Sequence, residues 1–136
     1  MIPAWFRDTI TAFGSQLGLR ALTSPREGVL QLTFESGEVL SLEPVGDREN
    51  PQALIVMERS TGQPEPAARS ALVRSHVLHG DPYPIQVAIR QSREDWRLLA
   101  AVRIPRRQFT ADRLAQTVEL LHRWLDDVLR PGGGHA

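Results

Sequence analysis

The sequence predicts an α+β fold in which three helices gather around an antiparallel five-stranded sheet, in the order α-β-β-β-α-β-β-α. Three observations predict it. Apolar residues recur at helical spacing at both ends of the chain, and the segments between alternate apolar and polar residues with a period of two. The first two alternating segments are separated only by Ser36-Gly37. Strands joined by so short a turn are antiparallel, and amphipathic helices then cover the sheet.

The first helix is expected over residues 3–17. Pro3 suits a first helical turn, and Gly18 can end the helix. A loop that contains Pro25 and Gly28 is expected to follow. The apolar stripe of this helix consists of Ile2, Phe6, Ile10, Phe13 and Leu17, with Trp5 beside it.

Three strands are expected next. In the first, Leu30, Leu32 and Phe34 alternate with polar residues, and after the Ser-Gly turn the second covers residues 39–45. The third strand, residues 53–59, is apolar enough at its centre to be covered on both faces. A break rich in Gly and Pro then leads to a second helix at residues 66–78, which Gly80 and Pro82 close.

The last third of the chain predicts a strand at 84–91, a strand at 96–104 and a helix at 110–130. Thr110 is a suitable N-cap, and Asp112 lies near the positive end of the helix dipole. The apolar stripe is wider than a surface helix needs. It comprises Leu114, Val118, Leu121, Leu125 and Val128, widened by Leu120, Trp124 and Leu129. We expect one domain over residues 1–130 and a flexible tail over 131–136.

Composition excludes several classes of function. The 16 basic residues, all arginine, balance 16 acidic residues, so the chain lacks the cationic surplus of a general nucleic-acid binder or of a protein that binds anionic lipid. The chain has no Cys, which favours a reducing compartment. It shows neither a signal peptide nor an apolar run long enough to cross a bilayer. We therefore expect a cytoplasmic protein.

No motif indicates catalysis, a cofactor or a metal. There is no Gly-x-Ser-x-Gly phrase, no Cys nucleophile and no Gly-rich phosphate loop ahead of a helix. His76 and His79, with Asp81 just beyond, have a spacing that can bind a metal, but no third ligand accompanies them in a recognisable motif. Asp126 and Asp127 point about 100° apart on a helix and do not converge. We predict that the protein is not an enzyme.

Two further features allow alternative interpretations. Arg103, Arg106 and Arg107 form a basic cluster that fits either an acidic partner segment or ordinary surface charge. His122 lies between apolar residues of the last helix and is expected at the boundary of the core.

Several local phrases, in their order, resemble the class I type III secretion chaperones, small cytosolic proteins that hold effectors before export. The likeness covers nearly the whole chain. The phrases are Phe13 followed by Leu17-Gly18, Leu40-Ser41-Leu42-Glu43, Arg103-Ile104-Pro105 and Val118-Glu119-Leu120-Leu121. The chain departs from that family in being electrically neutral, where such chaperones are usually acidic.

The resemblance implies a homodimer formed through the second helix and the strand after it, with Ala68, Leu72, Val87 and Ile89 at the interface. It also implies that apolar patches on the first helix and the sheet receive the extended N-terminal segment of an effector. No ATP, metal or catalysis is implied. The Ala-rich second helix independently fits close packing across a two-fold axis.

A polypeptide partner is also supported by the apolar surface itself. A strand can add to a sheet edge while pockets take its alternate side chains. Leu30, Leu32 and Phe34 suit such pockets, and Trp5 and Phe6 could border them, although each of these residues also fits an ordinary core position. The apolar total exceeds what a lone chain of 136 residues is expected to hide. An interaction or adaptor domain unrelated to secretion, or a small enzyme with an unmarked site, remain the alternatives.

Overall fold

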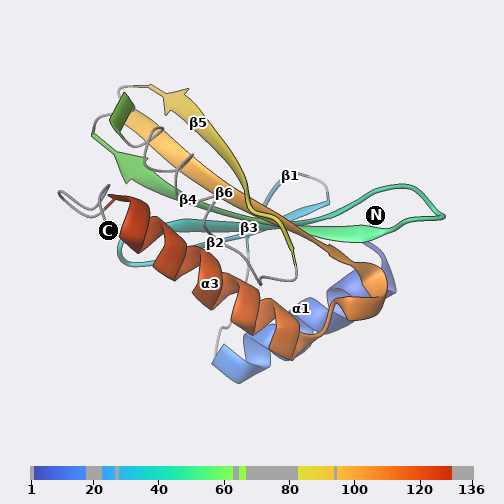
Figure 1. Cartoon of the computed structure of the whole chain (residues 1–136). Coiled ribbons are helices and arrows are strands. Elements are labelled where there is room, and N and C mark those ends of the chain that lie inside the picture. The colour runs from blue at the N-terminus through green and yellow to red at the C-terminus, as the bar shows by residue number, and fades with distance from the viewer. Residues whose placement is uncertain are drawn as a thin grey trace.

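In the part of the chain that the structure describes, a six-stranded antiparallel sheet carries two α-helices on one side (Figure 1). This computed structural model describes residues 2–17, 23–26, 28–62, 65–66, 83–93 and 95–129. The α+β class and the antiparallel pairing are confirmed. The elements are α1 (Ala4–Leu17), β1 (Thr23–Arg26), β2 (Val29–Thr33), β3 (Val39–Val45), β4 (Gln52–Thr61), β5 (Gln86–Ser92), β6 (Asp95–Pro105), the 3-10 helix η1 (Arg106–Gln108) and α3 (Ala111–Leu129).

The sheet order is β1-β2-β3-β4-β6-β5, so the predicted five strands are joined by a sixth at one edge. The segment of β1 was expected to be a loop, and that expectation was wrong. Its four residues, Thr-Ser-Pro-Arg, show no alternation and include a proline. Pairing with β2, through Thr23 opposite Gln31 and Arg26 opposite Val29, makes it a strand. Proline is tolerated there because β1 is an edge strand.

Two of the expected elements cannot be compared with the structure. The second helix, expected at 66–78, lies outside the described residues except for Pro66. The tail at 131–136 also lies outside them. The division into one domain and a tail stays a prediction. In the part of the chain that is described, no helix combines the length and the apolar character that crossing a bilayer requires.

The β2–β3 hairpin forms at the predicted Ser-Gly turn. The N–H of Gly37 donates to the carbonyl oxygen of Phe34 at 2.9 Å, and the N–H of Phe34 donates to the carbonyl oxygen of Glu38 at 2.8 Å. Gly37 has a φ of 90°, which a residue with a side chain rarely adopts. The turn therefore fixes the register of the hairpin, with Leu32 opposite Leu40 and Leu30 opposite Leu42.

Helix α3 begins as predicted. The backbone N–H of Arg113 donates to the hydroxyl of Thr110 at 3.1 Å, and Asp112 lies in the first turn. Leu114, Leu121 and Leu125 are fully buried against the sheet. The helix thus anchors its stripe in the core, as its amphipathic pattern predicts.

Rows of apolar side chains cross the helix-facing side of the sheet. One row contains Leu32, Leu40, Met57, Ala100 and Val87 in neighbouring strands. Its three central members are 0% exposed, whereas Leu32 and Val87 at its two ends are half-buried. The core is therefore complete under the middle of the sheet and incomplete toward β2 and β5.

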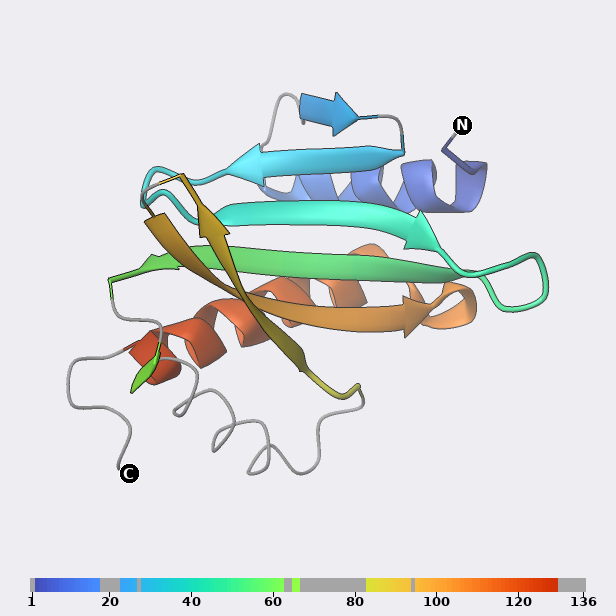
Figure 2. The ribbon, with the colours of Figure 1, turned by 90° about the horizontal axis from the view of Figure 1, so that it is seen from above.

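The opposite face of the sheet carries neither of the two described helices. Figure 2 shows the strands in front and both helices behind them. On this face Leu54, Val56 and Leu99 are half-buried. Of the third predicted strand, now β4, only Ala53, Ile55 and Met57 are fully buried. Among the described elements, its two faces are therefore covered unequally.

Candidate functional site

An apolar groove of about 450 Å³ opens between α1, α3 and the turn that joins β2 to β3. Phe13 of α1 and Met57 of β4 form its floor, and both are almost completely buried. Ala115 and Val118 of α3 form one wall and are half-buried. The full lining is Phe13, Phe34, Ser36, Glu38, Met57, Ala115, Val118, Glu119 and His122.

The width of the apolar stripe on α3 explains the groove. Leu114 and Leu121 point into the core and are 0% exposed, while Val118, on the same stripe, is left half-buried. Phe34, at the end of β2, is half-buried on the other side of the groove. Apolar side chains of a ligand that covered these walls would be removed from water, which stabilises a complex by roughly 25 cal/mol per Å² of apolar area.

A charged network closes one end of the groove. Glu38 is 2% exposed, and its carboxylate accepts a hydrogen bond from Arg59 Nε at 2.8 Å. Arg59 also donates to Asp126 at 2.6 Å. His122 Nδ1 lies 2.8 Å from Glu38 Oε1, and its Nε2 lies 3.5 Å from Asp126 Oδ2. The buried carboxylate is thus compensated by partners from β4 and α3.

The network has no arrangement typical of catalysis. In the described ranges, no hydroxyl group hydrogen-bonds to His122, whose ring contacts are with Glu38, Arg59 and Asp126. Nor do the described residues include a cluster of three or more His, Cys, Asp and Glu side chains that could hold a metal ion. His76, His79 and Asp81 lie outside the described residues. Through its apolar walls, the groove can bind apolar side chains.

Within the described residues, the pairing of β1 with β2 ends at Gln31, and residues 18–22, which precede β1 in the chain, lie outside the description. The register of β1 reaches only Val29 to Gln31. No described strand pairs with Leu32 or Thr33 on the side away from β3. Leu32 and Thr33 lead directly to Phe34 at the groove.

The structure brings only some of the predicted partner-binding residues together. Leu30, Leu32 and Phe34 follow one another along β2 and the start of its turn, and all three are half-buried. Trp5 is half-buried at the start of α1, where its ring packs edge-on against Phe6 and Phe109 with centroids 5.8 and 5.9 Å away. It does not line the groove.

Phe6 has a different position from the other four predicted partner-binding residues. It is 0% exposed, stacked on Phe109 with ring centroids 5.5 Å apart. Its side chain therefore packs against the ring of Trp5 and offers no surface to a partner.

The predicted dimer residues are described in part. Val87 and Ile89 lie on the edge strand β5, half-buried, opposite Ala100 and Leu98 of β6. Both pack against the core from the rim of the sheet. Ala68 and Leu72 lie outside the described residues.

Sequence reasoning missed the network around Glu38. Its members are far apart in sequence: Glu38 and His122 are separated by 84 residues, and Arg59 and Asp126 by 67. No local pattern marks such a contact. Val118, in contrast, belonged to a stripe that was recognised as too wide, and this signal could have assigned it to the groove.

A second ion-pair chain lies on the opposite face of the sheet. Glu58 accepts from Arg90 Nη2 and from Arg97 Nε, both at 2.8 Å, and Arg97 also reaches Asp95 at 3.2 Å. The hydroxyl of Ser60 donates to Asp95, whose two carboxylate oxygens lie 2.5 and 2.6 Å away. This hydrogen bond, aided by Arg97, lowers the pKa of Asp95 below its ordinary value.

Three solved structures share this arrangement of helices and strands. A chain of the HopA1–SchA chaperone–effector complex matches with a TM-score of 0.67 and 13% identity, covering 93% of this chain and 94% of that one. A chain of the complex of the Yersinia pestis type III secretion chaperone SycH with a stable fragment of YscM2 matches with a TM-score of 0.61 and 18% identity, covering 88% and 96%.

The third structure is YbjN from E. coli, for which a role in transcription regulation has been suggested. It matches with a TM-score of 0.56 and 14% identity over 95% of this chain and 90% of that one. No protein-family model matches the chain, and no curated sequence matches it. The resemblance to type III secretion chaperones that the sequence indicates is therefore confirmed at the level of the fold.

Proposed function

We propose that this chain is a non-catalytic secretion chaperone, which binds the N-terminal segment of a type III effector in extended form and keeps it competent for export. The observation that carries the proposal is the apolar groove between α1, α3 and the turn that joins β2 to β3. The similarity of the fold to chains of two chaperone complexes also supports this function. The proposed setting is the cytoplasm, where such a client would be held before export.

An extended client suits both parts of the site. Its backbone would pair with Leu32 and Thr33 of β2 on the side away from β3, where no described strand lies. Its alternate side chains would point toward the helices. The first of these side chains would meet the row that ends at Leu32, and another would enter the groove between Phe34 and Val118. A compact client would offer neither the strand nor the alternation.

The proposal includes a homodimer. Val87 and Ile89 are only half-buried on the edge strand β5 and leave apolar surface there. Light scattering is expected to give twice the 15.2 kDa of one chain. Val87→Glu should reduce it to one chain while circular dichroism stays unchanged, because the interface would have to bury an unpaired charge. A monomeric parent protein would remove the dimer from the proposal.

The groove itself is tested with Val118→Glu, which places a carboxylate on its half-buried wall. The tagged chain is purified from its host, the bound partner is identified by mass, and limited proteolysis maps the protected segment. We expect the N-terminal segment of an exported protein, and a loss of about tenfold in bound partner for Val118→Glu, because burial of an unpaired charge costs more than 1 kcal/mol.

Gln116→Glu is the matched control, since Gln116 is exposed on α3 and does not line the groove. It adds the same charge to the same helix and should leave binding unchanged. Full binding by Val118→Glu, or protection of a folded domain instead of an N-terminal segment, would refute the proposed function.

A second candidate is an interaction domain unrelated to secretion. The fold of YbjN favours it, because this fold also occurs outside the chaperone complexes. The same purification separates the two functions: the second predicts a partner that is not exported, bound through the same groove.

A further inference from the structure

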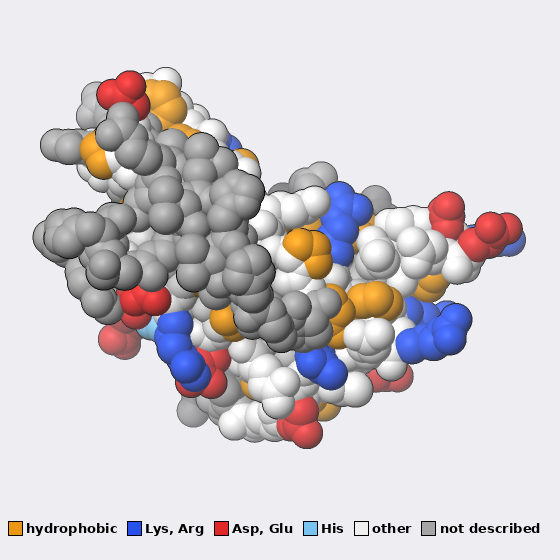
Figure 3. Space-filling view, in the orientation of Figure 1, with side chains coloured by type: hydrophobic (Ala, Val, Ile, Leu, Met, Phe, Trp, Pro, Cys, Tyr) orange, Lys and Arg blue, Asp and Glu red, His pale blue; other side chains and the backbone are white. Residues whose placement is uncertain are grey.

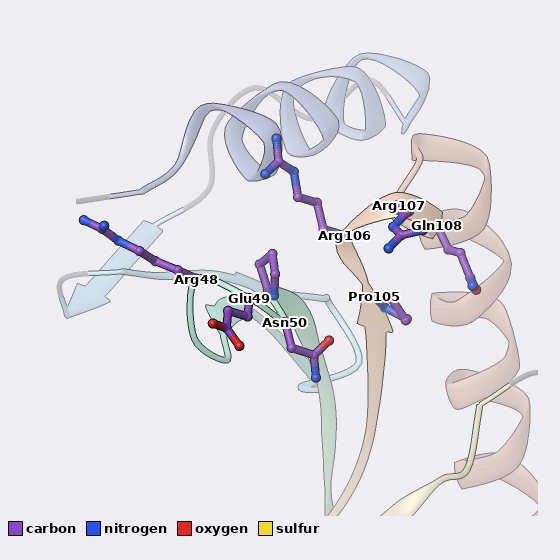
Figure 4. Close-up of a pocket in the computed structure, with 8 residues that line it drawn as sticks. Arg48, Glu49, Asn50, Pro105, Arg106, Arg107 and Gln108 are labelled. Atoms are coloured by element: carbon purple, nitrogen blue, oxygen red, sulfur yellow. The ribbon is translucent and has the colours of Figure 1, made fainter.

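A polar hollow of about 610 Å³ lies between the β3–β4 loop and the segment from the end of β6 through η1. Arg106 and Arg107 of the basic cluster in the sequence line this hollow, whereas Arg103 does not. Arg106 and Arg107 come from η1, and Arg48 joins them from the loop (Figure 4). Pro51 and Pro105 contribute apolar surface between them.

The backbone around the hollow is fixed in place. The carboxylate of Asp47 accepts hydrogen bonds from the backbone N–H groups of Glu49 and Asn50, at 3.0 and 2.8 Å. Gly46 has a φ of 85°, and a Cβ there would lie 2.2 Å from the carbonyl oxygen of Asn50. The N–H of Arg106 donates to the carbonyl oxygen of Pro51 at 3.0 Å and ties the two walls together. The hollow is therefore preorganised.

The arginines at this hollow lack anionic partners. In the described part of the chain, Arg48, Arg106 and Arg107 form no salt bridge, whereas Arg59, Arg90, Arg97 and Arg123 each pair with a carboxylate. Arg106 instead lies 5.8 Å from the ring centroid of Trp5. Figure 3 shows arginine and acidic side chains together at the right-hand end of the molecule, where the β3–β4 loop projects. The positive charge here is available to a ligand.

The directions of the arginines define the class of ligand. In Figure 4, Arg48 extends outward from the loop and Arg106 points toward α1. Arg107 lies beyond Arg106, on the side away from Arg48. Because the three side chains spread apart, they cannot chelate one phosphate or carboxylate. They can contact several anionic groups spaced along a chain. Glu49 within the hollow and the neutral charge of the whole protein disfavour a nucleic acid, whose phosphates need a denser field of cations.

We propose that this hollow binds an acidic stretch of a polypeptide, in which several Asp or Glu side chains pair with Arg48, Arg106 and Arg107. Arginine favours carboxylates because its planar guanidinium donates in a fork. The proposal rests on the proposed function only in assigning the acidic stretch to the bound client. The hollow and the apolar groove lie at opposite ends of the sheet, so one extended client could engage both.

The experiment uses a fluorescein-labelled peptide of alternating glutamate and glycine, and a glutamine–glycine peptide of the same length. Binding to the full chain is followed by fluorescence anisotropy at low and physiological salt. We expect the acidic peptide alone to bind, more weakly as salt screens the charges. The double variant Arg48→Gln/Arg107→Gln should bind it about fivefold more weakly, since each exposed pair contributes up to about 1 kcal/mol.

Arg93→Gln is the matched control, because Arg93 is exposed in the β5–β6 turn at the other end of the sheet. It removes one positive charge and should leave binding unchanged. Val118→Glu should also bind the acidic peptide normally, so a failed groove and a failed hollow give different results. Equal binding by the double variant, equal binding of the glutamine peptide, or tighter binding of single-stranded DNA than of the acidic peptide would overturn the proposal.

Discussion

The two ends of the sheet differ in whether their arginines pair with carboxylates. At the turn end, formed by residues 34–38, 58–61 and 92–97, arginines pair with carboxylates on both faces: Arg59 with Glu38, and Arg90 and Arg97 with Glu58. At the loop end, formed by residues 46–51 and 105–108, the arginines form no salt bridge with a described carboxylate. Both ends belong to one electrically neutral chain.

The difference separates structural charges from charges that a ligand can use. At the turn end, Glu38 is almost completely buried, and the guanidinium of Arg59 compensates the charge of its carboxylate. At the loop end, the arginines are exposed and their removal leaves no buried charge behind. Substitutions at the turn end should therefore change stability, and substitutions at the loop end should change binding.

The largest expected effect is that of Arg59→Ala at the turn end. It would leave Glu38 buried with His122 as its remaining ionisable partner, and we expect a loss of about 3 kcal/mol in the free energy of unfolding. Urea denaturation at pH 7 measures it. Arg123→Ala removes an exposed pair with Glu119 on α3 and should cost about 0.5 kcal/mol. Similar losses in the two variants would mean that the burial of Glu38 does not matter.

Gly46 is an exception at the loop end, because its substitution should change stability. Gly46→Ala should reduce the free energy of unfolding by about 2 kcal/mol, because the new methyl group meets the Asn50 carbonyl and the backbone is left-handed. Gly28→Ala has nearly the same φ, 83°, but no atom within 4 Å of the new Cβ, and should cost about 1 kcal/mol.

The two glycine variants also separate the shape of the loop from its charge. If the hollow is preorganised, Gly46→Ala should weaken binding of the acidic peptide although every arginine is retained. Gly28→Ala should bind that peptide like the parent chain. Normal peptide binding by Gly46→Ala would show that the shape of the β3–β4 loop is irrelevant to the site.

The sequence predicted those elements whose signal is local. The hairpin follows from alternation on both sides of Gly37, and α3 follows from its stripe and from the cap at Thr110. Strand β1 carries no such signal, because it becomes a strand only by pairing with β2.

The candidate site could be predicted only in part. Phe34 and Val118 belong to periodic patterns, so their apolar faces were visible in the sequence. Phe6 has the same pattern, yet it is fully buried, because periodicity reports which face is apolar and not which residue a second element covers. That Arg48 and Arg107 form no salt bridge with a described carboxylate was beyond prediction, since pairing depends on which carboxylates the fold brings near.

The smallest effect is expected at the turn end, where Ser60, Asp95 and Arg97 interact. Ser60→Ala removes the hydroxyl that is the main cause of the lowered pKa of Asp95, so this pKa should rise toward the ordinary value of about 3.9. A carboxyl whose pKa is lower in the folded state stabilises the fold above its unfolded pKa, and this contribution disappears as the pH falls through the folded pKa. Ser60→Ala should therefore behave like the parent chain in binding at pH 7 and lose part of the stability that Asp95 supplies above about pH 4. A carbon-13 NMR titration of the Asp95 carboxyl group measures the change. An unaltered titration would assign the lowered pKa to Arg97, which donates to the same carboxylate from two residues further along β6.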